Sequence, residues 1–344
     1  MKMKGTLAIV LILALAAAGC TVQDTGVKGQ TEVKVVEAGS DLIAVSSPVI
    51  NPSPPIITES PFRVQFTATN TEKPEKAKEL GAVSVWITDT GVCTLDKIRG
   101  GNAADLKVGT VYPGFVIKTV DGNKFSTVLR PGAQEIVDLD LTSPAKERIA
   151  GLTASCAIDY KLNFTTRAVT SMDTQVIDPV YRRTLEGAGK PPQFSPTENI
   201  DSGPLKIYFA DSATPIAGAL PLESKRNMVF FLWVENKGQG IYGSIKPGQL
   251  KLKVPAEFDW DPNKGACDKF SASKERGTGI DQNNWILTNN EELVFSAKKT
   301  PKLQCKFIMP TVEEGTSKKF FMSAEMEYNY EMRGTVTVSI KPAV

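Results

Sequence analysis

The sequence contains no histidine in its 344 residues. A chain without histidine cannot form a Ser-His-Asp or Cys-His catalytic site, a histidine general base, or a histidine-ligated zinc or haem site. The five cysteines include no CxxC pair, so the usual spacing of zinc ligands is missing as well. We therefore expect a protein that is not an enzyme and that needs no cofactor.

The sequence also lacks a large excess of positive or negative charge. The 40 lysine and arginine residues are balanced by 38 aspartate and glutamate residues, which leaves a net charge of +2. No cluster of basic residues stands out along the sequence, and nucleic acid is therefore not an expected partner. Beyond the first 20 residues, no apolar run reaches the ~20 residues that a membrane-spanning helix needs.

The one long apolar run, at 7–18, follows two lysines close to the N-terminus. A short positive segment followed by about a dozen apolar residues is typical of a secretory signal peptide. Small residues end the run and precede Cys20, which resembles the lipobox of lipoproteins, where the cysteine is lipidated and becomes the mature N-terminus. The position of the usual lipobox leucine is held by Ala17.

We interpret residues 1–20 as a lipoprotein signal peptide and lipobox, with the lipid on Cys20. Ordinary secretion with a free cysteine and an uncleaved anchor are the alternatives, and all three place the chain outside the cytoplasm. The polar residues 21–31 are typical of a flexible tether. The expected location is the cell surface, with the membrane as a partner through the lipid anchor.

Four cysteines remain if Cys20 carries lipid, and an even number in an exported chain indicates disulfides. Four cysteines allow three pairings, but each half of the sequence holds two. We therefore predict the pairs Cys93–Cys156 and Cys267–Cys305. Each bridge would close a loop of tens of residues and contribute ~3–4 kcal/mol in the chain-entropy model.

From Glu32 onward, β-branched and aromatic residues alternate with polar ones, and Gly, Pro, Asn and Asp interrupt them at strand-length intervals. The alternation is clearest in RVQFTAT (63–69), LKLKV (250–254) and TVTVSI (335–340). Many short strands separated by turn residues predict an all-β fold of the β-sandwich kind.

The two halves of this β-rich region resemble each other. VQFTATNTEKPEKA in the first half corresponds to VFFLWVENKGQGIY in the second. Two copies of one unit predict two similar sandwiches in series. The corresponding positions are Asn70 and Asn236, Tyr160 and Tyr328, and the preceding strands 32–39 and 205–211.

We predict two Ig-like β-sandwich domains in tandem, at 32–178 and 204–344. The segment 179–203 between them is rich in proline and glycine, which is typical of a linker. The proline-rich stretch 46–61 is expected to form a long surface loop of the first domain, because proline cannot donate to a β-ladder. A domain boundary in this stretch is the alternative.

The strand ending WVENKGQG (233–240) resembles the CARDB-type immunoglobulin-like domains of bacterial and archaeal surface proteins, in which a strand ends in V-x-N-x-G. TATNTEKPEKA (67–77) is a weaker match that lacks the glycine. The late Tyr-rich strand, with a cysteine and following threonines, resembles that of uncharacterised archaeal surface lipoproteins of tandem-sandwich build. The resemblance implies adhesion, assembly or presentation at the surface, and it carries no catalytic residues.

The stretch DWDPNKG places Asp259, Asp261 and Asn263 at alternate positions. Oxygen ligands at this spacing can wrap a calcium ion. Lys264 occupies the sixth position, where an EF-hand loop needs glycine, so the fit is weak. A polar turn made of turn-favouring residues is the alternative, and we prefer it.

Three further features have a functional and a structural interpretation. Asn163 begins an NFT glycosylation pattern, but it falls within an expected strand. Tyr328 and Tyr330 share one face of a strand and could stack on a sugar, although core packing is the expected role of such a pair. Trp233 is expected in the core.

These observations favour a membrane-anchored cell-surface lipoprotein that acts as a structural, adhesive or binding module, with a surface protein or polysaccharide as partner. An accessory subunit of an envelope secretion, pilus or transport complex is the first alternative. An extracytoplasmic hydrolase that uses two carboxylates is the second alternative, because such acids need only meet in space.

Overall fold

The computed structural model describes residues 41–71, 82–99, 111–112, 115–121, 124–129, 132–149, 153–190, 198–200, 203–210, 222–261, 265–275 and 284–343. The signal segment with Cys20, the tether 21–31 and the predicted strand 32–39 lie outside the described residues. Residues 31–344 form one compact unit, and everything described below belongs to it.

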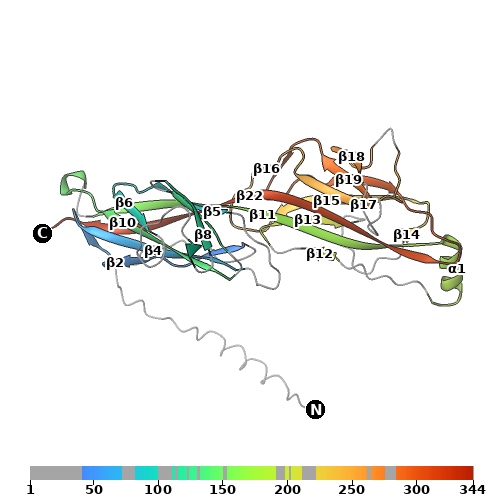
Figure 1. The fold of residues 1–344 in the computed structure, drawn as a ribbon, viewed down its shortest axis with the longest axis horizontal. Helices are drawn as coiled ribbons and strands as arrows, with labels where there is room; N and C mark the ends of the chain where they lie inside the picture. Colours follow the sequence, from blue (N-terminus) through green and yellow to red (C-terminus); the bar gives the residue numbers. More distant parts are fainter. Residues whose placement is uncertain are drawn as a thin grey trace, which may run out of the picture. The chain divides into compact units, whose positions relative to one another are not determined.

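Two long strands, β11 (Ala154–Ile177) and β22 (Ser317–Lys341), organise the fold and lie side by side in Figure 1. They pair antiparallel from Ala154 opposite Ile340 to Ile177 opposite Ser317, with no shift of register. At ~3.3 Å per residue, the 24 residues of β11 extend over ~80 Å, whereas strands are usually 3–10 residues long. One strand from each half of the sequence therefore contributes to a single continuous ladder.

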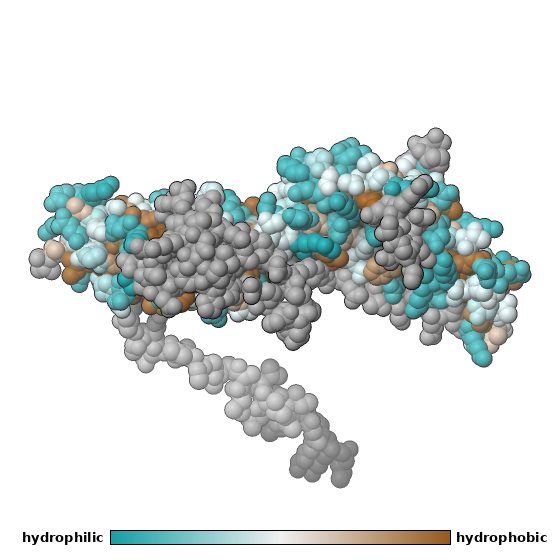
Figure 2. Space-filling view, in the orientation of Figure 1, coloured by the Kyte–Doolittle hydropathy of each residue, from teal (hydrophilic) through white to brown (hydrophobic). Residues whose placement is uncertain are grey.

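Burial along both strands follows the two-residue period of β structure. Even-numbered residues are buried from Cys156 to Val176 and from Phe320 to Ile340, apart from Gly334, while odd-numbered residues face outward. The buried face is rich in Leu, Ile, Val, Met and aromatic residues, and the outward face in charged and hydroxyl side chains. Figure 2 shows hydrophilic side chains over much of the described surface, among scattered hydrophobic ones. This alternation sets which residues of the ladder can form the core.

The long pair lies in the middle of a large sheet of order β18-β19-β17-β22-β11-β5-β9-β8-β7. Three short strands also pair with β11 or β22. The bounds of these strands are β3 (Ile56–Ile57), β5 (Ala82–Asp89), β7 (Val111–Tyr112), β8 (Phe115–Asp121), β9 (Lys124–Val128), β12 (Glu198–Ile200), β14 (Leu222–Glu223), β17 (Leu250–Pro255), β18 (Phe270–Glu275) and β19 (Asn284–Asn289).

Smaller antiparallel sheets complete the core, in the orders β1-β4-β10-β6, with β2 on β4, and β13-β15-β21. Their inner residues belong to the same hydrophobic core as β11 and β22, and Phe66 of β4 stacks on Tyr160 of β11 with ring centroids 4.8 Å apart. The remaining elements are β1 (Ile43–Val45), β2 (Val49–Asn51), β4 (Pro61–Asn70), β6 (Thr94–Arg99), β10 (Gln134–Thr142), β13 (Leu205–Ala210), β15 (Asn227–Asn236), β16 (Ser244–Ile245), β20 (Leu293–Val294), β21 (Leu303–Ile308), the 3₁₀ helix Lys146–Arg148 and α1 (Pro179–Gly187).

The internal repeat is present in the hydrogen-bond register. Strand β4 ends at Asn70 and strand β15 at Asn236, an offset of 166 residues. Phe66 pairs with Val137 between β4 and β10. Adding the same offset to both residue numbers gives Leu232 and Leu303, which pair between β15 and β21. The two halves therefore build the same central strand pair.

The strand before each copy differs from the sequence-based prediction. Ile43 of β1 lies opposite Asn70, just as Leu205 of β13 lies opposite Asn236. The counterpart of β13 is therefore β1, and the earlier segment 32–39 was the wrong assignment. The error arose because 32–39 has the stronger alternating pattern, while β1 is only 3 residues long.

The all-β fold class is confirmed, and the strands predicted at 63–69, 250–254 and 335–340 lie within β4, β17 and β22. The proline-rich stretch 46–61 is mostly exposed but contains the short strands β2 and β3. The division into sandwiches at 32–178 and 204–344 stays a prediction, and the shared β11–β22 ladder bears on how independent such domains can be.

The predicted linker 179–203 begins with a helix, α1, that the sequence analysis did not anticipate. Asp178 caps it, because its carboxylate accepts hydrogen bonds from the backbone N–H groups of Val180 and Tyr181. Pro179 follows at the first helical position, where a missing N–H is harmless. These two residues are a helix-start signal inside a segment that is otherwise rich in turn formers.

Candidate functional site

The VENKGQG motif forms a buried hydrogen-bonded loop. The side chain of Asn236 donates to the Gly240 carbonyl (3.0 Å) and accepts from the Gly238 N–H (3.0 Å) and the Tyr330 hydroxyl (2.9 Å). A Cβ atom at Gly238 or Gly240 would lie 2.2 or 2.3 Å from neighbouring atoms, so both positions need glycine. The motif that carries the family resemblance therefore closes a loop onto the core.

Asp41, the first described residue, is buried against this loop. Its carboxylate accepts the Gln239 N–H at 3.0 Å, and burial raises the pKa of the carboxyl above its ordinary value of 3.8. The neighbouring Leu42 is also buried, close to Gly203. Asp41, the 236–240 loop and Tyr330 come from the start, middle and end of the described chain and meet here. These contacts indicate a structural role for the loop.

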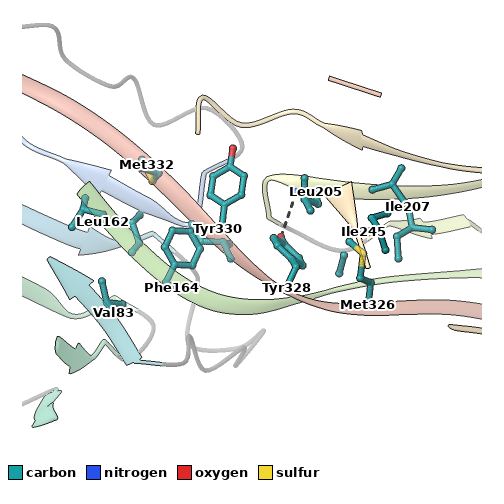
Figure 3. Close-up of a cluster of buried hydrophobic side chains, with 14 of the residues drawn as sticks. Val83, Leu162, Phe164, Leu205, Ile207, Ile245, Met326, Tyr328, Tyr330 and Met332 are labelled. Atoms are coloured by element: carbon teal, nitrogen blue, oxygen red, sulfur yellow. Dashed lines mark hydrogen bonds between the residues drawn. The ribbon is translucent and has the colours of Figure 1, made fainter. Parts of the chain in front are cut away.

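Tyr328 and Tyr330 belong to the core (Figure 3). They are 1% and 0% exposed, so neither can stack on a sugar. The Tyr328 hydroxyl accepts the Leu205 N–H at 3.3 Å, and burial raises the pKa of both phenols well above the usual value. The core-packing interpretation of this pair is therefore the correct one.

An open hollow of about 390 Å³ lies on the outward face of the ladder beside β17. Arg167 of β11 forms an ion pair with Glu325 of β22 (3.1 Å), and the Thr165 hydroxyl donates to Asn329 (2.5 Å). Glu327 also lines the hollow. A carboxylate-dependent glycosidase places two acids around the scissile bond. Here the two acids, Glu325 and Glu327, are neighbours on the same face of β22, and Arg167 forms an ion pair with Glu325.

The outward face of the β13–β15–β21 sheet carries aromatic and cationic side chains together. Tyr208 and Trp233 are cross-strand neighbours whose rings stack 5.1 Å apart at 11°. The Lys302 ammonium lies 4.7 Å from the Trp233 ring centroid. We call this surface the lysine–aromatic face; its residues are Lys206, Tyr208, Phe231, Trp233, Glu235, Lys237, Lys299, Lys302, Gln304 and Lys306.

The sequence analysis missed this face because it assigned Trp233 to the core. Residues 228–234 are apolar throughout, so period-two alternation could not show which side of β15 faces outward. In the structure, Phe230, Leu232 and Val234 are buried, and Trp233 is only partly buried. The alternation of Lys206 and Tyr208 with buried residues of β13 was the available signal.

Among the described residues, two disulfides are present, Cys93–Cys156 and Cys267–Cys305. These are the pairings expected from the sequence. The first joins the turn before β6 to the start of β11, and the second joins the segment before β18 to β21. Each bridge therefore connects different sheets or sheet edges within one half of the sequence.

The weak candidate sites remain without a binding arrangement in the described part of the chain. Asp259 and Asp261 are exposed, and Asn263 lies outside the described residues. Among the residues described, no group of three or more His, Cys, Asp or Glu could hold a metal ion. Asn163 lies on the outward face of β11, and its glycosylation stays a prediction. Cys20 lies outside the described residues, and no described helix has the length and apolar character to span a bilayer.

No protein-family model matches the chain, and neither does any curated protein sequence. Among solved structures, the chain is similar to the major pilin subunit BcpA of Bacillus cereus, at 9% identity and a TM-score of 0.23, over 85% of this chain and 67% of the pilin. It is also similar to domains D2 and D3 of the major pilin SpaD from Corynebacterium diphtheriae, at 10% identity and a TM-score of 0.19, over 63% of this chain and 86% of that one.

Proposed function

We propose that the chain is a lipid-anchored protein of the cell surface whose folded part is a structural and binding module. The observation that carries the structural part is the β11–β22 ladder, which runs for 24 residue pairs without a register shift. Bending this ladder within the plane of the sheet would strain the backbone hydrogen bonds that join its two strands. Such a fold suits a stiff structural module that carries a binding surface.

The anchor part of the proposal depends on Cys20 and the apolar run before it. Replacing Cys20 by Ser should move the protein from the membrane fraction to the soluble fraction or the medium, because a hydroxyl side chain cannot take the thioether-linked lipid. Thr21→Ser, one residue further on, is the matched control and should leave the protein on the membrane. A wild-type protein that is already soluble after signal removal would exclude the lipoprotein assignment.

A further inference from the structure

We propose that the lysine–aromatic face binds an acidic polysaccharide, whose carboxylates meet the lysine ammonium groups while its sugar rings contact the aromatic side chains. The inference deepens the proposed function and rests on it, because an exported surface protein is the kind of chain that meets such polymers. It names the ligand class of the binding module.

The charge on this face differs from that of the whole chain. Five lysines lie on it or at its margin, and Glu235 is the acid among its residues, although the chain as a whole has a net charge of only +2. Lys237 and Lys299 both contact the Glu235 carboxylate, at 2.7 and 3.2 Å. Asp268 borders the face, where its carboxylate accepts the Gln304 N–H at 3.4 Å. The face therefore keeps a clear positive excess, which complements a polyanion.

The spacing of the cations suits an extended polymer. Lys302 directly precedes β21, and Lys306 lies on the same side of the sheet, four residues or ~13 Å further along the strand. Both lysines are exposed, as is Gln304 between them. A row of ammonium groups along one strand can follow a chain of repeated carboxylates better than it can enclose a single small anion.

The aromatic pair gives the face a second kind of contact. Tyr208 and Trp233 are partly exposed, and they combine large apolar surface with a polar edge. Phe231 lies next to them, opposite Gln304 of β21. Sugar rings carry apolar C–H faces between their hydroxyls, so they can pack against such side chains while their carboxylates reach the lysines.

The side-chain chemistry favours a carboxylated polysaccharide over nucleic acid. Every cation of this face is lysine, a strongly hydrated point charge, whereas arginine is the residue that grips phosphate in a fixed bidentate geometry. Electrostatic binding by exposed lysines should also weaken steeply as salt is added. The absence of arginine from this face is therefore the feature that favours a carboxylate polymer, and its binding should be salt-sensitive.

Affinity electrophoresis of the detergent-solubilised full chain in gels containing polygalacturonate tests the proposal, with dextran as the neutral polymer and double-stranded DNA as the phosphate polymer. Wild type should be retarded by polygalacturonate alone. Lys302→Glu/Lys306→Glu should weaken binding by about tenfold or more, because it inverts two charges of the face. The matched control is Lys251→Glu/Lys253→Glu, which makes the same charge change on exposed positions of β17 and should bind within about twofold of wild type.

A third variant, Trp233→Leu, tests the aromatic contact and should weaken binding while its thermal unfolding shows that it is folded. Three results would overturn the proposal: no retardation of wild type at low salt, equal loss in both charge variants, or DNA binding as tight as polygalacturonate binding. The membrane fractionation of Cys20→Ser is independent of these gels. A failure of this inference is therefore distinguishable from a failure of the proposed anchor.

Discussion

Asn236 shows how one amide can hold several segments of chain together. Both of its polar atoms are buried and hydrogen-bonded, to the Gly238 N–H, the Gly240 carbonyl and the Tyr330 hydroxyl. The equivalent Asn70 is 0% exposed and donates to the Leu129 carbonyl at 3.0 Å. An asparagine at the end of this strand therefore ties it to the following loop in one half and to a distant segment in the other.

Replacing Asn236 by Ala should lower the free energy of unfolding by about 2–4 kcal/mol, because two buried donors and one carbonyl lose their partners. Urea denaturation monitored by circular dichroism measures the change. Asn290→Ala is the control, since Asn290 is exposed and should shift stability by less than about 0.5 kcal/mol. Equal stability of N236A and wild type would contradict the structural role of the motif.

Asp41 should make the stability of the protein depend on pH. Burial raises the pKa of its carboxyl above 3.8, so the folded state holds the proton more tightly than the unfolded state does. The stability from this group is complete below pH 3.8 and is lost as the pH rises through the folded-state pKa. Asp41→Asn, which still accepts the Gln239 N–H, should therefore match wild type in acid and exceed it at neutral pH.

Thermal unfolding of wild type and D41N between pH 3.5 and 7.5 tests this sign. The stability advantage of D41N over wild type should increase as the pH rises. Substitutions far from the loop should not change this difference. A D41N protein that is less stable than wild type at neutral pH would show that the charged carboxylate is net stabilising.

At the scale of elements, the β11–β22 ladder places one large residue directly opposite the smallest one. Tyr160 lies opposite Gly334, and a Cβ on Gly334 would come within 2.3 Å of the Tyr160 ring and hydroxyl. The ring cannot move aside easily, because it is buried and stacked on Phe66. Glycine is therefore needed here for space, at a position where the burial alternation of β22 is interrupted.

Gly334→Ala should lower stability by about 1–3 kcal/mol, the usual cost of overpacking a core. Gly243→Ala is the control, because nothing lies within 4 Å of a Cβ built there. Combining G334A with Tyr160→Leu should recover part of the loss, since the smaller side chain leaves room for the methyl group. Strict additivity of the two changes in a denaturation cycle would rule out the proposed contact.

The disulfides act at the same scale, since each fixes one element to another. Cys93 and Cys156 are 63 residues apart, so removing their bridge should cost roughly 4 kcal/mol in the chain-entropy model. Cys93→Ser/Cys156→Ser should accordingly unfold at lower denaturant concentration than wild type under oxidising conditions, and the two should differ little once both are reduced. Peptide mapping without reductant should find the two bridges and no link between Cys93 or Cys156 and Cys267 or Cys305.

At the scale of the whole molecule, the ladder makes the two halves of the sequence depend on each other. Val336, Val338 and Ile340 of β22 are buried opposite the start of β11, within the core that the first half builds. The first half alone therefore lacks a strand of its own core. Tandem sandwiches joined only by a flexible linker would not have this property.

Expressing 32–178 and 204–344 separately tests that dependence. Neither piece should show a cooperative unfolding transition by itself, because each would expose the apolar face of one long strand. Co-expression should restore a folded complex, detectable by size-exclusion chromatography. Cooperative unfolding of the isolated 32–178 piece would establish it as an independent domain instead.

The sequence alone determines where many of the strands lie. Alternation of apolar and polar residues was enough to predict β structure at 63–69, 250–254 and 335–340, because period two is a local property of a strand. The repeat was also visible, since equivalent strands end in Asn70 and Asn236.

The partner of each strand was decided only in three dimensions. Tyr160 and Tyr328 mark strands that belong to different halves, yet their strands β11 and β22 pair with each other over 24 residues. Alternation tells which residues of a strand are buried but says nothing of which strand lies beside it. Likewise, an unbroken apolar run leaves both faces of β15 equally able to be buried, so the outward position of Trp233 emerged only when the sheet packed on the core.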